Sequence, residues 1–205
     1  MKTCVIFGAG EYDAYRPAYD ENFFYIAADG GLKEMLACGI TPNLLIGDFD
    51  SLDITPPQGI PHVRLPVQKD VTDMDAAVAE GRIRGYSDFI LLGGMGGRPD
   101  HTMANYSLLA RLSQQNCTAK LYGEGFTVTA VTDGAVDFAA GYSGTAAVFS
   151  WTDVSEGVDI KGMAYELENG RLVNNFALGV SNRFTGAPAR IEVKKGTLLI
   201  MAETP

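Results

Sequence analysis

The stretch Leu44-Leu45-Ile46-Gly47-Asp48-Phe49-Asp50-Ser51 joins a short apolar run to two carboxylates that are two residues apart. Side chains in an extended chain alternate with a period of two, so Asp48 and Asp50 can point the same way at the end of a buried strand. Crowded carboxylates repel each other unless a cation lies between them. The stretch therefore indicates a metal site, and the alternative is a polar turn after a strand, because Asp and Ser favour turns.

Short apolar runs like this one alternate with segments of helical spacing over the first part of the chain. Strands that alternate with helices indicate parallel βαβ units, with both faces of the sheet covered. The predicted strands are Thr3–Phe7, Phe24–Ala28, Leu44–Ile46, His62–Leu65, Phe89–Leu92 and Thr118–Tyr122. The predicted helices cover residues 31–38, 72–84 and 101–115.

The pattern changes near residue 125 to short strands separated by turn residues, with no segment of helical spacing. Asn169-Gly170, which lies between two apolar segments, predicts a hairpin turn. The predicted fold class is α/β: an N-terminal parallel-sheet α/β domain, residues 1–124, followed by a C-terminal antiparallel β-sandwich, residues 125–205. The predicted strands of the second domain are Phe126–Val131, Ala146–Trp151, Val158–Lys161, Ala189–Val193 and Thr197–Met201.

Composition narrows the class of partner. The 205 residues are 46% hydrophobic and carry a net charge of −9, which argues against binding to duplex nucleic acid. We expect no membrane segment, because no apolar run approaches the roughly 18–20 residues that span a bilayer. The three cysteines have no CxxC spacing and the N-terminal apolar run is too short for a signal peptide, so a cytoplasmic location is expected.

Polar residues gather where the predicted strands end. Asp29 follows Phe24–Ala28, and the turn Gly93-Gly94-Met95-Gly96-Gly97 follows Phe89–Leu92. Ligands of open parallel sheets bind beyond the carboxyl ends of the strands. Four glycines let the backbone approach a ligand closely, and Arg98 adds a planar fork for phosphate. Asp100 belongs to the same group, unless it only caps the helix that follows.

The stretch Gln68-Lys69-Asp70-Val71-Thr72-Asp73-Met74-Asp75 allows two interpretations. Thr72 can cap a helix whose first turn holds Asp73 and Asp75, where carboxylates favour the positive end of the helix dipole. Capping does not explain Lys69 and Asp70. A lysine beside a helix N-terminus can contact a phosphate, so the alternative is a phosphate and metal role for some of these residues. Gly8-Ala9-Gly10 after the first strand lacks the third glycine of a dinucleotide fingerprint and indicates a tight turn near a ligand.

Together these motifs resemble the thiamine pyrophosphokinase (thiamine diphosphokinase) family, bacterial type, over essentially the whole chain. Matching stretches near the C-terminus are Tyr165–Leu172 and Gly179–Phe184. The other matching stretches, in the order of the family, are Ala28–Gly31, Pro42–Ser51, Lys69–Asp75 and Gly94–His101.

The resemblance implies an α/β catalytic domain followed by a β-sandwich, in homodimers whose active sites are shared between subunits. The implied reaction uses ATP and thiamine as substrates and Mg²⁺ as cofactor. It transfers a diphosphoryl group, so the thiamine hydroxyl attacks the β-phosphorus and AMP is released with thiamine diphosphate. Such transfer depends mainly on positioning and on charge stabilisation.

Carried onto this sequence, the resemblance assigns roles to three groups of residues. The expected catalytic and metal-binding carboxylates are Asp48, Asp50 and Asp73, with Asp100 as a candidate for the thiamine hydroxyl or aminopyrimidine. The expected ATP-binding residues are Asp29, Gln68, Lys69, Asp70, Thr72 and Arg98. The expected thiamine-binding residues are Asp100, Ser181 and Asn182, with Trp151, Tyr165 and Phe184 available for stacking unless they belong to the core.

One departure and three alternatives accompany this interpretation. Arg183 stands where the family commonly carries an acidic residue, which bears on substrate preference more than on reaction class. The acceptor can instead be another hydroxymethyl heterocycle, such as a pterin. A regulatory protein without turnover fits less well, because binding alone does not need so many carboxylates. In haloacid-dehalogenase-like phosphatases the nucleophilic Asp follows the first strand, whereas Asp48 follows a later one.

Overall fold

The computed structural model describes residues 2–13, 18–49, 54–66 and 70–204. The predictions made for Asp50, Gln68 and Lys69 fall outside these ranges. The chain divides into two compact units. The first comprises Met1–Leu108 with Ala119–Glu124, and the second comprises Leu109–Thr118 with Gly125–Pro205.

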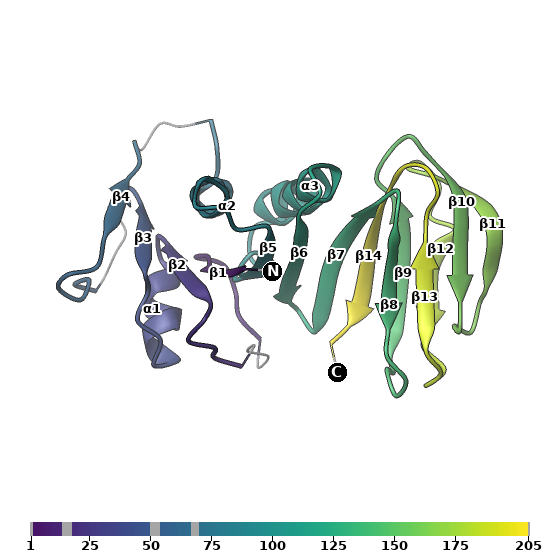
Figure 1. The fold of residues 1–205 in the computed structure, drawn as a ribbon, viewed down its shortest axis with the longest axis horizontal. Coiled ribbons are helices and arrows are strands. Elements are labelled where there is room, and N and C mark those ends of the chain that lie inside the picture. The colour runs from purple at the N-terminus through teal and green to yellow at the C-terminus, as the bar shows by residue number, and fades with distance from the viewer. Residues whose placement is uncertain (1, 14–17, 50–53, 67–69, 205) are drawn as a thin grey trace. The chain divides into compact units, whose positions relative to one another are not determined.

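The first unit is built on a sheet with the strand order β6-β5-β1-β2-β3-β4 (Figure 1). Its strands are β1 (Thr3–Phe7), β2 (Phe24–Ala28), β3 (Leu44–Gly47), β4 (His62–Arg64), β5 (Asp88–Leu92) and β6 (Thr118–Gly123). Strand β1 pairs in parallel with both β2 and β5, and the β2–β3 and β3–β4 pairs are also parallel. The predicted parallel sheet is confirmed, with strand bounds within a residue or two of those expected.

Helices α1 (Gly31–Ala37) and α2 (Asp73–Ile83) cover opposite faces of this sheet, and α3 (Pro99–Gln114) connects β5 to β6 (Figure 1). The side chains of successive residues in β1 point to opposite faces of the sheet. Val5 and Phe7 join the core cluster beneath α1, which also includes residues of β2 and β3. Cys4 lies on the other face, against Gly81 of α2. Both faces of the sheet are thus apolar, which explains the near-continuous apolar runs in its strands.

The strand order creates a switch point at β1. The chain passes from β1 outward through β2, β3 and β4, and then returns to the other side of β1 as β5. Loops after β1 and β5 therefore leave the sheet in different directions, and a crevice opens between the carboxyl ends of these two strands. The segments that follow β1 and β5 are Gly8-Ala9-Gly10-Glu11 and the glycine-rich turn at residues 93–97.

The second unit contains two groups of antiparallel strands, ordered β12-β9-β14-β7 and β11-β10-β13-β8. A core cluster that includes Val148, Val158, Ile160, Leu198 and Ile200 draws on strands of both groups. This is the predicted antiparallel sandwich. Its strands are β7 (Phe126–Thr132), β8 (Ala135–Phe138), β9 (Thr145–Ser150), β10 (Val154–Lys161), β11 (Leu167–Val173), β12 (Gly179–Arg183), β13 (Ala189–Glu192) and β14 (Thr197–Glu203).

The predicted hairpin at Asn169-Gly170 is wrong, because β11 runs through both residues as one strand. The register between β10 and β11 shifts on either side of Val158, which pairs with Gly170. Asn169 adopts a left-handed φ of 46°, and its N–H donates to Oδ1 of Asp159 at 2.7 Å. The Asn-Gly pair thus supplies the unusual backbone of a β-bulge instead of a chain reversal.

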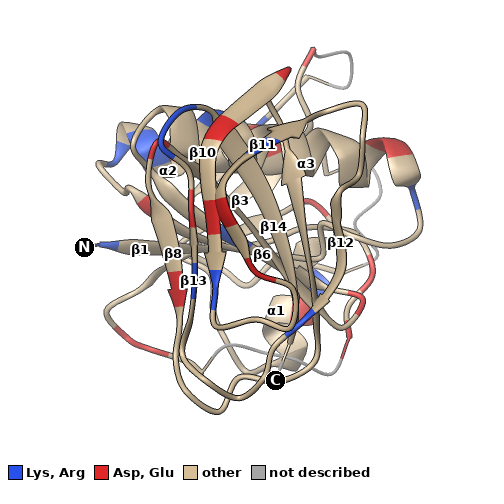
Figure 2. Cartoon of the chain, turned by 90° about the vertical axis from the view of Figure 1, so that its right-hand side faces the viewer, with Lys and Arg blue, Asp and Glu red and all other residues tan. Residues whose placement is uncertain are grey.

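Charged positions of both signs are interspersed along the ribbon in Figure 2. Acidic residues outnumber basic ones, 25 against 16, over the full sequence. Within the described residues, no helix is both long and apolar enough to cross a membrane.

Candidate active site

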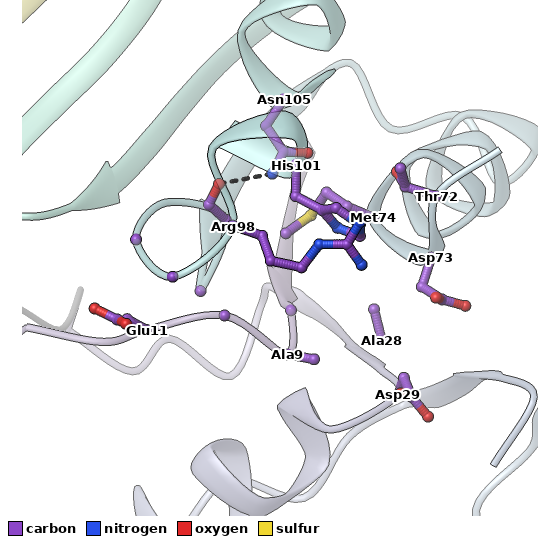
Figure 3. A pocket seen from close by; sticks show the side chains of 16 residues that line it. Ala9, Glu11, Ala28, Asp29, Thr72, Asp73, Met74, Arg98, His101 and Asn105 are labelled. Atoms are coloured by element: carbon purple, nitrogen blue, oxygen red, sulfur yellow. Dashed lines mark hydrogen bonds between the residues drawn. The ribbon is translucent and has the colours of Figure 1, made fainter. Parts of the chain in front are cut away.

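A cavity of about 440 Å³ occupies the crevice at the switch point of the first unit. This volume falls within the range of small-molecule sites. Four segments and helix α3 provide the lining, and several of these residues are drawn in Figure 3. They are Gly8–Glu11 after β1, Ala28 and Asp29 at the end of β2, Thr72–Met74 at the start of α2, Gly93, Gly94 and Gly96–Arg98 after β5, and His101 and Asn105 of α3.

Two backbone hydrogen bonds join the walls of the cavity at its base. The N–H of Gly8 donates to the carbonyl of Leu92 at 2.8 Å, and that of Gly10 donates to the carbonyl of Gly93 at 2.9 Å. A Cβ on Gly10 would lie 2.6 Å from the Gly93 carbonyl oxygen, so this approach requires glycine. The Gly8-Ala9-Gly10 turn therefore shapes the cavity, as its sequence indicated.

The glycine-rich turn is held from behind by Asn105 of α3. This side chain is buried, and its amide nitrogen donates to the Gly94 carbonyl at 2.7 Å (dashed line in Figure 3). A buried amide that bonds a turn in this way fixes the turn's path, since breaking the bond would leave a polar group unsatisfied. The turn therefore enters the cavity on a rigid support.

Asp29 and Asp73 lie on the same side of the cavity in Figure 3. Asp29 follows β2, and its N–H donates to the carbonyl of Ile46 in β3 at 2.8 Å, while its Oδ1 atom is buried. A Cβ on Gly47 would lie 3.2 Å from the Asp29 Cα, so the backbone of β3 passes close beside Asp29. Asp48 comes directly after Gly47 and thus belongs to the same edge of the sheet, although it does not line the cavity.

Thr72 and Asp73 bring the start of α2 into the lining. The Thr72 hydroxyl oxygen accepts from the N–H of Asp75 at 3.1 Å, which is the predicted N-cap. Asp73 lines the cavity and Asp75 does not. Two carboxylates in one helical turn thus have different environments, and only the first is placed to act on a ligand.

Arg98 enters the lining paired with Asp100. Its Nε donates to Oδ1 of Asp100 at 3.1 Å and its Nη2 to Oδ2 at 2.5 Å, a bidentate contact in which both side chains are exposed. The hydrogen bond from Arg98 lowers the pKa of the Asp100 carboxyl. Arg98 extends over the cavity in Figure 3, whereas Asp100 does not line it.

The structure thus brings together four of the residues predicted for the site: Asp29, Thr72, Asp73 and Arg98. Asp48, Asp70 and Asp100 lie outside the lining, and Asp50, Gln68 and Lys69 lie outside the described residues.

Sequence reasoning did not select Glu11, His101 or Asn105 as site residues. Helical spacing was the available signal for the last two, because residues four apart share one helix face and His101 already belonged to a motif. Glu11 directly follows the Gly8-Ala9-Gly10 turn.

The residues predicted to bind thiamine belong to the second unit. Asn182 is buried in β12 and makes three backbone hydrogen bonds: its amide nitrogen donates to the Tyr165 carbonyl, and its Oδ1 accepts from the N–H groups of Tyr165 and Arg183. Ser181 is exposed, with a left-handed φ of 62°. Phe184 packs against Phe138 and Tyr142, whose ring centroids lie 4.8 Å and 4.6 Å, respectively, from the ring centroid of Phe184.

Phe184 is therefore a core residue, and Tyr165 remains available for stacking because it is 63% exposed. Trp151 is partly buried.

A parallel sheet with helices on both faces and a glycine-walled cavity at its switch point is typical of nucleotide-binding α/β proteins. A family model described as the thiamin pyrophosphokinase catalytic domain matches residues 15–121, and the chain belongs to this family. The family and fold expected from the sequence are confirmed. Membership of this family confirms the activity predicted from the sequence, which is that of a thiamine diphosphokinase.

Individual relatives are similar to the chain in sequence or in fold. The chain is 27% identical over 195 residues to a thiamine pyrophosphokinase of Bacillus subtilis, covering 90% of this chain and 89% of that protein. A crystal structure of thiamine pyrophosphokinase from Bacillus subtilis matches with a TM-score of 0.88 at 24% identity, covering all of both chains. The thiamin pyrophosphokinase of Candida albicans has the same fold, with a TM-score of 0.77 at 14% identity, covering 99% of this chain and 90% of that one.

Proposed function

We propose that the cavity at the switch point binds ATP with Mg²⁺, and that this chain transfers the β,γ-diphosphoryl group of ATP to the hydroxyl of thiamine. The observation that carries the proposal is the meeting, in one cavity, of glycine-lined walls, Arg98 and two carboxylates, Asp29 and Asp73. Glycine turns admit phosphates close to the backbone, arginine balances their charge, and carboxylates bind the accompanying cation.

The donor set fits Mg²⁺. Within the described residues, no three acidic, histidine or cysteine side chains form a metal centre. Mg²⁺ needs only one or two carboxylates, since water and phosphate oxygens complete its coordination. Asp73 would hold the ion with Asp48 of the neighbouring edge, and Asp50 is assigned to the same ion. When bound, Mg²⁺ neutralises phosphate charge and orients the transferring group.

The residues of the chain position the reactants. Arg98 supplies two parallel N–H donors to phosphate oxygens, and the start of α2 at Thr72 and Asp73 adds the positive end of a helix dipole. Lys69, Gln68 and Asp70, just before α2, are assigned to the same phosphates. As the thiamine oxygen bonds to the β-phosphorus, the bond between this phosphorus and the oxygen bridging to the α-phosphorus breaks. AMP then leaves with that oxygen, and the hydroxyl proton passes to a base.

The residues that we assign to thiamine binding in the second unit are Ser181 and Asn182. Ser181 is the exposed polar residue of the predicted pair, so we assign the direct contact to Ser181 and a positioning role to Asn182. Asp100 keeps its assignment as a candidate for the thiamine hydroxyl or aminopyrimidine, in addition to its contact with Arg98.

We further propose a homodimer in the cytoplasm. Support for the dimer comes from large exposed apolar side chains in one segment of the second unit, Tyr165, Phe176, Leu178 and Val180, since such residues often mark an interface. Support for the location comes from the cysteines, which are all free thiols. Burial raises the pKa of the Cys4 thiol to about 12, so this thiol stays protonated and unreactive at neutral pH.

The test is an assay with purified protein, ATP, Mg²⁺ and thiamine, in which both products are identified by mass. Thiamine diphosphate with AMP is expected, and chelation of Mg²⁺ should abolish the reaction. ADP with thiamine monophosphate would mean attack at the γ-phosphorus and would overturn the proposal. Light scattering on the same preparation tests the dimer, which a fully active monomer would exclude.

A further inference from the structure

We infer that Glu11 recognises the nucleoside half of the nucleotide, with its carboxylate accepting hydrogen bonds from the ribose hydroxyls. This inference rests on the proposed function, because it assumes that the cavity holds a nucleoside triphosphate. It adds the direction in which the nucleotide lies and a residue that selects for the sugar.

Glu11 lines the cavity on a segment whose path is fixed. It comes one residue after Gly10, whose N–H bonds the Gly93 carbonyl at 2.9 Å, and Glu11 itself forms an antiparallel bridge with Met95. The segment after β1 and the glycine-rich turn after β5 are therefore connected up to this point. The Glu11 side chain thus projects from a backbone held on both sides, although the residue is exposed.

The glycine-rich turn leaves room for this carboxylate. A Cβ on Gly96 would lie 2.8 Å from Oε2 and 2.9 Å from Cβ of Glu11, and Gly96 has a φ of +80°. A Cβ on Gly97 would lie 3.4 Å from Oε1. The glutamate side chain therefore lies across two glycines at the edge of the cavity.

Charge decides which end of the nucleotide meets Glu11. Figure 3 shows Glu11 at one end of the cavity, Asp29 and Asp73 at the other, and the Arg98 side chain between them. A triphosphate is favoured where Arg98 and a carboxylate-bound cation balance its charge, which is the end of Asp29 and Asp73. A carboxylate without such a cation repels phosphate and accepts hydrogen bonds from hydroxyl groups. The uncharged sugar therefore belongs beside Glu11.

Asp29 is the competing candidate for the sugar. It follows the second strand, the position from which an acidic residue binds ribose in dinucleotide-binding folds. Here, however, Asp29 shares its end of the cavity with Asp73, and its Oδ1 atom is buried. Glu11 instead lies exposed at the opposite end, where it can reach a sugar without approaching the phosphates.

The experiment is calorimetric titration of the purified full chain with Mg²⁺ and either ATP or 2′,3′-dideoxy-ATP, without thiamine. A hydrogen bond to a charged group gives roughly tenfold or greater discrimination. Wild type should therefore bind the dideoxy nucleotide at least tenfold more weakly, and Glu11→Ala should bind both nucleotides equally. Inorganic tripolyphosphate should bind wild type and Glu11→Ala alike, because the phosphate end is unchanged. Glu21→Ala, which removes an exposed glutamate outside this cavity, should keep the wild-type ratio.

Three results would overturn the inference: equal binding of both nucleotides by wild type, discrimination that survives in Glu11→Ala, or discrimination that is lost in Asp29→Ala instead. Failure of the proposed function looks different. A protein that discriminates through Glu11 but forms no thiamine diphosphate would refute the reaction and leave the nucleotide assignment intact. A protein that forms thiamine diphosphate but binds ATP and the dideoxy nucleotide equally would refute the role of Glu11 and leave the proposed reaction intact.

Discussion

The start of α2 and the end of β12 each contain a pair of polar residues predicted to serve the active site, and the structure uses the two pairs differently. At α2, Thr72 caps the helix through its hydroxyl and still lines the cavity beside Asp73. At β12, Asn182 is buried with three backbone hydrogen bonds, and Ser181 alone is exposed.

The difference shows what a motif can and cannot reveal. A polar residue in a motif can either contact a ligand itself or hold in place the backbone that does. Asn182 bonds both the N–H and the carbonyl of Tyr165, so it has the contacts of a structural residue. Asp73 has the position of a ligand-binding residue. Substitutions at the two places should therefore separate catalysis from stability.

The largest effect is expected for Asp73→Asn, which keeps the size of the side chain and removes its charge. Loss of a group that helps to bind the metal and to stabilise developing charge should lower kcat by roughly 100-fold or more. Steady-state assays with saturating ATP and thiamine measure this change. Asp75→Asn is the matched control, because Asp75 lies in the same helical turn but outside the cavity. Equal losses in both variants would show that the helix dipole, not the cavity position, matters.

The second effect concerns stability in the sandwich. Asn182→Ala leaves two N–H groups and one carbonyl without their partner, and we expect a loss of about 2–4 kcal/mol in the free energy of unfolding. Urea unfolding followed by circular dichroism measures it. A variant as stable as wild type would mean that water replaces the lost bonds, and that Asn182 is not a structural residue.

Ser181→Ala tests the ligand side of the same strand. The exposed hydroxyl should contribute little to stability, while its loss should raise the KM for thiamine about threefold, the size of an ordinary hydrogen bond. The KM for ATP should stay unchanged. A change confined to the KM for ATP would remove Ser181 from the thiamine site.

Much of the first unit could be predicted because its signals are local. Each parallel strand is a short apolar run, and Thr72 is the N-cap residue that marks the start of α2. The carboxyl ends of such strands share one edge of the sheet, so Asp29 and the glycine-rich turn after β5 could be expected to meet.

Other features depend on partners that are distant in sequence. Asn169-Gly170 has the sequence of a hairpin turn, but its pairing with β10 makes it a bulge. The contact of Glu11 with the glycine-rich turn joins residues about 85 positions apart, so the local sequence around residue 11 does not predict it. The same holds for the buried amide of Asn105, which is defined only by the turn it supports.

The smallest effect is expected for Asp100→Asn, which separates a direct role from a positioning role. Asp100 holds Arg98 by two hydrogen bonds between exposed side chains, a type of contact that contributes little. Losing it should raise the KM for ATP by only about twofold, because Arg98 becomes free to leave the phosphates, and should raise it much less in an Arg98→Ala background. Since pairing with Arg98 lowers the pKa of Asp100 below its usual value of 3.8, the carboxylate stays charged from neutral pH down to about 5. The KM for ATP should therefore show no titration of this group as the pH is lowered from neutral to about 5. If Asp100→Asn instead raises the KM for thiamine alone, the carboxylate meets the acceptor directly, and the ion pair with Arg98 must open when substrates bind.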